Sequence, residues 1–343
     1  MRRTRVAGSL LVAAALAGAT ACTGSDGTAP QTAAEATTLT VAFGPSAEHP
    51  QAAALTTFGT GVSEATDGRI AVSVQTDQTM GDAATALRGV ADGTIDLAVV
   101  SGPTLEPFNE DFGLFDLPYV FASPDAQAAA LADRAVTEAL FPTLEESRNI
   151  TVLGGMYGGT RNVYTIDAPV RGPADLAGRT IRVPSSQAAV AMIEAMGGVA
   201  VPMALKDVRP GLGNGTVDGA ENTVLTYTEQ GHLDAAPQYS ATAHLMIPDY
   251  LVINTDRLAS LSDGDRQVLL EAVPGLIGQA NSTMLDAEGA ARATAEEGGA
   301  TFVDDVDVQA FADLTRPQVE DSLTNEVRVR LYEAVQRANE AHP

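Results

Sequence analysis

Cysteine and lysine are almost missing from this sequence of 343 residues, which has one of each, Cys22 and Lys206. A single cysteine excludes an intramolecular disulfide bond and any zinc site built from thiolates. Because there is only one lysine, arginine supplies nearly all of the positive charge. Its planar guanidinium can hold a carboxylate with two parallel hydrogen bonds.

Positive charge as a whole is also scarce. The chain has 20 Lys and Arg residues against 44 Asp and Glu residues, which gives a formal charge of -24 at pH 7. Nucleic-acid binding needs clustered cations that neutralise phosphates, and binding to an anionic membrane surface needs a polybasic patch. We therefore expect neither of these partners.

Motifs of the common catalytic and cofactor sites are missing too. The sequence has no G-x-S-x-G, no H-E-x-x-H, no phosphate loop ending in Gly-Lys-Ser or Gly-Lys-Thr, and no G-x-G-x-x-G after a predicted strand. The four histidines, His49, His232, His244 and His342, are scattered without metal-ligand spacing. We therefore predict a protein that is not an enzyme and that holds neither a cofactor nor a metal.

The N-terminus has the pattern of a bacterial export signal. Arginines precede an apolar run, Val6–Ala19, that is too short to span a membrane. The sequence ATAC ending at Cys22 resembles a lipobox, which would make this cysteine a lipidation site, although Ala stands where Leu is usual. An ordinary secretory peptide is the alternative. We expect a lipoprotein signal peptide over 1–21 and a flexible tether, rich in Thr, Ala, Gly and Pro, over 22–38.

Beyond the tether, apolar segments alternate between the period of strands and the period of helices. Strands are expected at 39–43, 69–76 and 95–101, with helices between them at 49–66 and 82–93. Gly93 should end the second helix. This order predicts an α/β fold with a mainly parallel, doubly wound sheet.

The same order returns later in the chain, where a helix at 187–198 separates strands at 179–184 and 199–203. A long helical stretch over about 262–298 contains Pro274, which should kink or split it.

The simplest architecture is a pair of α/β lobes joined by crossing strands, with the long helix over both. We assign 39–160 with about 250–285 to the first lobe, and 161–249 with about 286–343 to the second.

Four segments resemble, in order and spacing, signatures of the solute-binding subunits of tripartite ATP-independent periplasmic (TRAP) transporters. They are DLAGRTIRVPSS (Asp175–Ser186), MGGVAVPM (Met196–Met203), GTVDGAEN (Gly215–Asn222) and TAHLMIPDYLVIN (Thr242–Asn254). Upstream, GRIAVSV, ADGTIDLAVVS and FDLPYVFASPDA fit the same family. The resemblance implies a two-lobed clamp for organic acids, of the periplasmic-binding-protein type and type II-like.

The resemblance also implies ligand-binding residues. In this family an arginine of the IRVP strand pairs with the ligand carboxylate, and Arg182 holds that position. Arg161 matches a second arginine, and Asn222 matches the asparagine that closes the DGAEN motif. Alternation with Ile181 and Val183 supports the first assignment, because it turns Arg182 away from their apolar face. On sequence alone, both arginines could be solvated, and Asn222 could cap the following helix.

Other polar residues near these motifs are weaker candidates. Glu48 and His49 lie in the first strand-to-helix loop, where ligand groups sit in doubly wound folds. Asp218 and Glu221 are expected to be structural, because carboxylates facing an anionic ligand would oppose it.

Two features bear on which acid is bound. The VDGAEN motif with Tyr227 shortly after it is closer to the hexuronate and sugar-acid branch of the family than to the C4-dicarboxylate branch, so Tyr227 joins the candidates. Where relatives have an aromatic-led helix, this chain reads RPGLGNG, and Arg209 could add a cation near the pocket or face solvent. We favour a hexuronate or related sugar acid, with a C4-dicarboxylate or other carboxylate as the alternative.

These expectations describe a transport protein outside the cytoplasm. Its expected partners are a small carboxylate ligand, the membrane subunits of a TRAP permease, and the membrane through lipidated Cys22. It would lie at the outer face of the cytoplasmic membrane or in a periplasm. A binding protein of an ATP-driven importer is the alternative within the same fold, and a secreted hydrolase is disfavoured by the missing catalytic motifs.

The lipid anchor can be tested by replacing the cysteine. Cys22→Ala should move the protein from the membrane to the soluble fraction, because the side chain that would carry the lipid is gone. Fractionation and immunoblotting measure this. Wild-type protein that is fully released, with no change in the variant, would contradict lipidation.

Overall fold

The computed structural model describes residues 36–343, so the predicted signal peptide, Cys22 and most of the tether lie outside the described residues. Nine strands within this range form one sheet: β1 (Thr37–Phe43), β2 (Ile70–Gln75), β3 (Leu97–Ser101), β4 (Ile150–Thr165), β5 (Thr180–Val183), β6 (Val199–Pro202), β7 (Gly219–Thr223), β8 (Gln238–Asn254) and β9 (Thr301–Val303).

Helices cover both faces of this sheet. The α-helices are α1 (Pro50–Ala65), α2 (Ala83–Asp92), α3 (Gly102–Leu105), α4 (Pro124–Ala132), α5 (Arg134–Thr137), α6 (Glu145–Arg148), α7 (Pro173–Leu176), α8 (Gln187–Ala195), α9 (Val208–Gly213), α10 (Val224–Glu229), α11 (Thr255–Ser260), α12 (Asp263–Glu297), α13 (Val308–Ser322) and α14 (Glu326–Ala341). Short 3-10 helices are η1 (Glu110–Asp116), η2 (Phe141–Leu144), η3 (Leu205–Asp207) and η4 (His232–Asp234). Among the helices of residues 36–343, none combines the length and the apolar character needed to cross a membrane.

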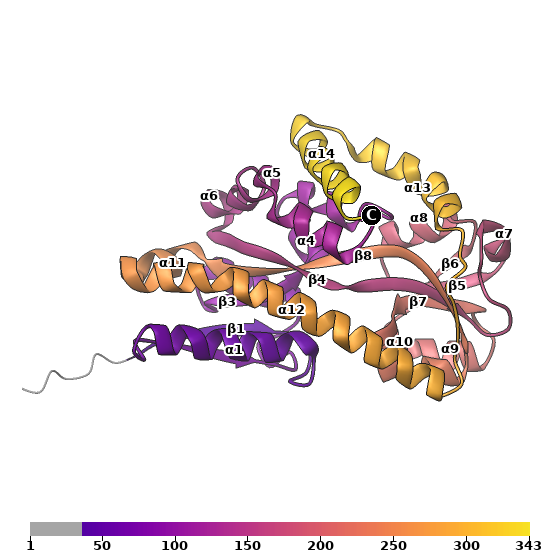
Figure 1. Ribbon diagram of the computed structural model, residues 1–343, viewed down its shortest axis with the longest axis horizontal. Coiled ribbons are helices and arrows are strands. Elements are labelled where there is room, and N and C mark those ends of the chain that lie inside the picture. Colours follow the sequence, from indigo (N-terminus) through magenta and orange to yellow (C-terminus); the bar gives the residue numbers. More distant parts are fainter. Residues whose placement is uncertain (1–35) are drawn as a thin grey trace, which may run out of the picture. The chain divides into compact units, whose positions relative to one another are not determined.

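Two long strands, β4 and β8, run through the middle of the sheet (Figure 1). The strand order is β2-β1-β3-β8-β4-β7-β5-β6, and β9 also pairs with β8. On one side β1 is parallel to β2 and β3, and on the other side β5 is parallel to β6 and β7. β8 is antiparallel to β3 and β4, and β4 is antiparallel to β7. Five of the eight strand pairs are therefore parallel, as expected, and the predicted crossing strands β4 and β8 take part in all three antiparallel pairs.

We call β1, β2 and β3 with their helices the β1–β3 half, and β5, β6 and β7 with theirs the β5–β7 half. Strand alternation places apolar side chains on both faces of each half. In β1, Val41 and Phe43 pack with α1 and α12, while Ala42 lies in the core on the opposite face with α2. Each half therefore has a core on both sides of the sheet.

α12 links the two halves, because it packs against α1 of the β1–β3 half, against β4, and against α10 of the β5–β7 half (Figure 1). The helix continues through Pro274, so the predicted split there is wrong. A proline in a helix interior costs about 3 kcal/mol. Leu269, Val273 and Leu276 are buried around it, and burying each such side chain contributes roughly 1.5–3 kcal/mol. Tertiary packing thus outweighs the local cost of the proline.

The last helix returns to the β1–β3 half. α14 packs against α4, α5 and η1, and its Leu331 and Val335 join the core there. The sequence assigns about 286–343 to the second lobe, whereas the α14 part of this range packs with the β1–β3 half.

Gly219 of β7 lies where the sheet leaves no room for a side chain. A Cβ there would lie 2.5 Å from the backbone oxygen of Tyr164 and 2.8 Å from Cγ2 of Thr165. Gly219→Ala should therefore lower the free energy of unfolding by about 1–3 kcal/mol, the usual cost of overpacking. Urea unfolding followed by circular dichroism measures this change.

Gly278→Ala is the matched control, because a Cβ at that position of α12 meets nothing within 4 Å. Alanine is the better helix former by about 1 kcal/mol, so this variant should be at least as stable as the wild type. Equal losses of stability in both variants would contradict the steric explanation.

Candidate functional site

β4 and β7 bring Arg161 and Glu221 into a buried ion pair. Nε of Arg161 lies 2.7 Å from Oε2 of Glu221, and Nη2 lies 2.8 Å from Oε1. The Glu221 side chain is 1% exposed and the Arg161 side chain 15%. Two parallel hydrogen bonds fix the guanidinium plane as well as its charge.

His244 of β8 joins this pair. Its Nε2 lies 3.3 Å from Oε2 of Glu221, and its Nδ1 lies 2.9 Å from the hydroxyl of Thr242. Burial lowers the pKa of His244, so the ring is neutral at pH 7 and can donate its Nε2 proton to Glu221. Burial alone would raise the pKa of Glu221, but Arg161 and His244 hold it at about 2. The carboxylate is thus ionised and fully engaged.

Arg182 of β5 is also a buried cation, but it binds a backbone carbonyl rather than a carboxylate. The residue is 3% exposed, and its Nε and Nη2 donate to the carbonyl oxygen of Met203, at 2.9 and 2.6 Å. In the described part of the chain, no Asp or Glu oxygen lies within ion-pair distance of it. Burial lowers the pKa of Arg182, and the nearby charge of Glu221 opposes this shift.

The orientation of Arg182 agrees with the strand alternation. Ile181 and Val183 pack with α8 in one core, whereas Met203, which binds Arg182, packs against the core of the opposite face. Arg182 therefore leaves the apolar face of its neighbours, as predicted.

Asn222 lies inside β7, next to Glu221, and is 7% exposed. Its Oδ1 accepts hydrogen bonds from Nη1 of Arg161 at 3.1 Å and from the amide of Thr223 at 2.9 Å. The alternative of a helix cap is wrong, because the side chain of Thr223 caps α10 by accepting from the Thr226 amide. Within residues 36–343 the Nδ2 donors of Asn222 have no partner.

The other candidates lie apart from these contacts. Glu48 is exposed in the loop between β1 and α1, and His49 caps α1 by accepting from the Gln51 amide at 3.3 Å. Burial lowers the pKa of His49. Tyr227 is fully buried, and its hydroxyl donates to the carbonyl of Ala236 at 2.9 Å. Its ring packs in the core against Tyr164 and Tyr239.

Arg209 of α9 faces outward. Arg209 has a side chain that is 58% exposed, and Nη2 pairs with Asp234 at 2.5 Å. Asp218 accepts hydrogen bonds from the amide and the hydroxyl of Thr180. Both residues therefore have structural partners.

Sequence reasoning missed the contacts of His244 and Gln51. His244 is a fully buried polar residue of β8, and a polar group in a buried strand needs a partner. Gln51 of α1 reaches the crossing strands, where Nε2 donates to the carbonyl of Tyr157 at 3.2 Å and to Asp249 at 3.0 Å. Burial raises the pKa of Asp249 to about 6.

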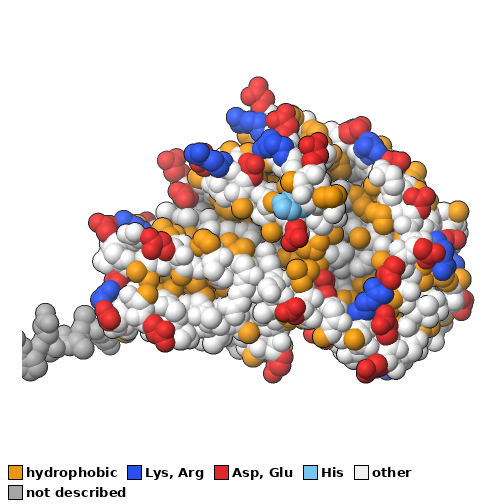
Figure 2. Space-filling view, viewed as in Figure 1, with side chains coloured by type: hydrophobic (Ala, Val, Ile, Leu, Met, Phe, Trp, Pro, Cys, Tyr) orange, Lys and Arg blue, Asp and Glu red, His pale blue; other side chains and the backbone are white. Residues whose placement is uncertain are grey.

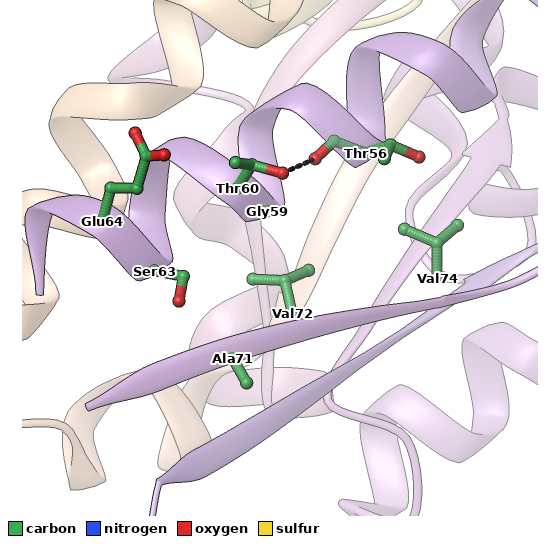
Figure 3. A pocket seen from close by; sticks show the side chains of 8 residues that line it. All are labelled: Thr56, Gly59, Thr60, Ser63, Glu64, Ala71, Val72 and Val74. Carbon is green, nitrogen blue, oxygen red and sulfur yellow. Dashed lines mark hydrogen bonds between the residues drawn. The ribbon is translucent and has the colours of Figure 1, made fainter. Parts of the chain in front are cut away.

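A surface hollow between α1 and β2 is a separate feature (Figure 3). Thr56, Thr60, Ser63 and Glu64 line it from the helix, and apolar residues of β2 close its floor. Its only charged lining group is a carboxylate, so this hollow does not suit an anion. In the described part of the chain, no group of three or more His, Asp, Glu or Cys side chains could hold a metal ion.

A family model, a curated relative and solved structures that match this chain are all of solute-binding proteins. The family model described as bacterial extracellular solute-binding protein, family 7, matches residues 42–326. A curated solute-binding protein of Chromohalobacter salexigens is 34% identical over 224 residues, which is 65% of this chain and 66% of that protein.

Two solved structures of TRAP periplasmic solute-binding proteins are similar over almost their whole length. One, from Anaerococcus prevotii with bound α/β-D-glucuronate, is 30% identical, with a TM-score of 0.79 over 90% of this chain and 99% of that chain. The other, from a Sulfitobacter species with bound β-D-galacturonate, is 26% identical, with a TM-score of 0.75 over 88% and 100%.

Glu221 should make stability depend on pH. Its pKa is about 2 in the folded protein against an ordinary value of 4.5. Its stabilising effect is therefore complete above pH 4.5 and is lost as the pH falls toward 2, a difference of roughly 3 kcal/mol. Glu221→Gln keeps the shape and removes the charge, so it should be less stable than the wild type at pH 7 by about 3 kcal/mol. The two proteins should become equally stable as the pH approaches 2.

Urea unfolding at a series of pH values measures this convergence. Glu229→Gln is the control, because Glu229 is an exposed acid at the end of α10. A Glu221→Gln protein with the stability of the wild type at pH 7 would contradict the role of the pair.

Proposed function

Because the chain belongs to family 7 of the bacterial extracellular solute-binding proteins, we propose that it captures a hexuronate or related sugar acid and delivers it to a TRAP-type secondary transporter. The two similar solved structures, which hold D-glucuronate and β-D-galacturonate, support this choice of ligand. The membrane subunits of the transporter are the proposed partners of the loaded protein.

The buried charge of Arg182 carries this proposal. A cation removed from water without a counter-ion is costly, by several kcal/mol. Glu221 offsets this charge only in part, because Arg161 already binds both of its carboxylate oxygens. A ligand carboxylate would supply the missing charge. Since Met203 occupies the edge formed by Nε and Nη2, the carboxylate would approach the edge formed by Nη1 and Nη2.

The remaining polar groups would orient the sugar. Arg161 holds Oδ1 of Asn222, which leaves the Nδ2 donors of Asn222 for ligand oxygens. Arg161 itself acts in this proposal mainly by holding Asn222. Glu48 and His49, at the carboxyl end of β1, would meet sugar hydroxyls from the β1–β3 half. Tyr227 supports the core behind the site.

Capture would close a clamp. We propose that 39–160 with about 250–285, joined by α14, moves against 161–249 with most of 286–325. The ligand must contact both lobes, because only contacts that the open state lacks can shift the population to the closed state.

Other ligands and attachments remain as further proposals. A C4-dicarboxylate would satisfy Arg182 equally but would not need groups for sugar hydroxyls. Delivery to an ATP-driven importer is the second candidate partnership. The family supports a location outside the cytoplasm, and the lipid anchor at Cys22 is our proposal for how the protein stays at the membrane.

Titration calorimetry of the mature protein with D-glucuronate and D-galacturonate tests the function. We expect both acids to bind and neutral D-glucose not to bind, because only the acids pair with Arg182. Arg182→Lys keeps the charge and loses the planar pair of donors. Removing one partner of a desolvated pair costs roughly 2–5 kcal/mol, so Arg182→Ala should bind about thirtyfold to several thousandfold more weakly, and Arg182→Lys should lose part of this affinity.

Arg209→Lys is the matched control, because Arg209 is exposed and paired with Asp234. It should change affinity by less than about threefold, under roughly 0.7 kcal/mol. Binding of D-glucose in preference to the acids, or Arg182→Lys protein with the affinity of the control, would overturn the proposal.

A further inference from the structure

β4 changes its register with β8 where it passes between the two halves of the sheet. Tyr157 is opposite Pro248 and Thr160 is opposite Met246, so the two glycines between them face a single residue of β8. Gly159 has a φ of 105°, which a residue with a side chain rarely adopts. Such a bulge leaves backbone amides without partners in the neighbouring strand.

Two side chains of α12 bind the amides on either side of this bulge. Oδ1 of Asn281 accepts from the amide of Tyr157 at 2.8 Å, and Oε1 of Glu288 accepts from the amide of Thr160 at 2.9 Å. Oε2 of Glu288 accepts from the hydroxyl of Tyr157 at 2.7 Å. That hydroxyl also lies 2.6 Å from the hydroxyl of Thr160. Glu288 therefore binds both ends of the bulge.

The spacing of these contacts matches the geometry of both elements. Asn281 and Glu288 are seven positions apart, which is a rise of about 10.5 Å along a helix. Tyr157 and Thr160 are three positions apart, which is about 10 Å along a strand. These two spacings match, so one helix can reach the amides on both sides of the bulge.

The segment held by Glu288 ends at the candidate site. Thr160 is the residue before Arg161, and pairing of β4 with β7 begins at Arg161. We propose that Glu288 is a positioning residue for ligand capture: by holding the Thr160 amide, it fixes Arg161 and, through Arg161, Glu221 and Asn222. This inference rests on the proposed function of the same site.

The direction of the effect follows from the loss of the hydrogen bonds that Glu288 accepts. Without Glu288, the Thr160 amide has no acceptor, and a cavity lined by Thr160, Asn162, Gly289 and Phe302 gives the strand room to move. Ligand binding must then order the segment before Arg161, which weakens affinity. We expect the dissociation constant of Glu288→Ala to rise about tenfold, mainly through faster dissociation.

Two variants make the test specific. Glu288→Gln keeps a carbonyl oxygen for the Thr160 amide and should bind within about threefold of the wild type. Asn281→Ala removes the same kind of acceptor from the same helix, but on the side of the bulge away from Arg161. It should also bind within about threefold of the wild type.

Calorimetry with D-glucuronate and hydrogen exchange of the ligand-free proteins give the two measurements. Glu288→Ala should speed exchange of the amides at 160–163, and Asn281→Ala should not. Unchanged affinity in Glu288→Ala, or an equal loss in Asn281→Ala, would overturn this inference and leave the proposed function standing. Wild-type protein that binds no uronate would overturn both.

Discussion

Two arginines and one glutamate share the interior of the β5–β7 half, and the site depends on how these three charges are balanced. Glu221 is bound by Arg161 through both oxygens and by the neutral ring of His244. This arrangement satisfies one positive charge and leaves Arg182 with only the carbonyl oxygen of Met203. A carbonyl dipole does not offset a full charge that has been removed from water. The fold therefore carries a local excess of one positive charge in a place that favours an anion.

The crossing strands explain why these charges meet. Arg161 belongs to β4, His244 to β8, and Glu221 with Asn222 to β7, three neighbours in the sheet. β4 pairs with β8 along both halves, but its register shifts where the partner strands change. Irregular backbone at that point needs acceptors from outside the sheet, and α12 supplies them. The same helix thus connects the halves and supports the strand that carries Arg161.

Local patterns predicted much of this structure. The first three strands and the intervening helices are present, and Gly93 ends α2 with a φ of 74°. Motif spacing identified the family, which the family model confirms over residues 42–326, and strand alternation gave the face of Arg182. Pairing between distant strands could not be predicted, because periodicity does not state which strand lies beside which. The contact of His244 with Glu221 was therefore missed, and the packing that keeps α12 intact at Pro274 was underestimated.

The same local balance resolves an apparent conflict between an acidic protein and an anionic ligand. Acidic side chains are spread over the face drawn in Figure 2, with Lys and Arg side chains among them, and the whole chain has a formal charge of -24. Exposed charges are screened beyond about 8 Å at physiological salt. A buried guanidinium in contact with a carboxylate interacts several-fold more strongly, because little water separates them. Net charge can slow the approach of an anion, but affinity is decided by the groups that touch it, and the nearest acid, Glu221, is already neutralised by Arg161.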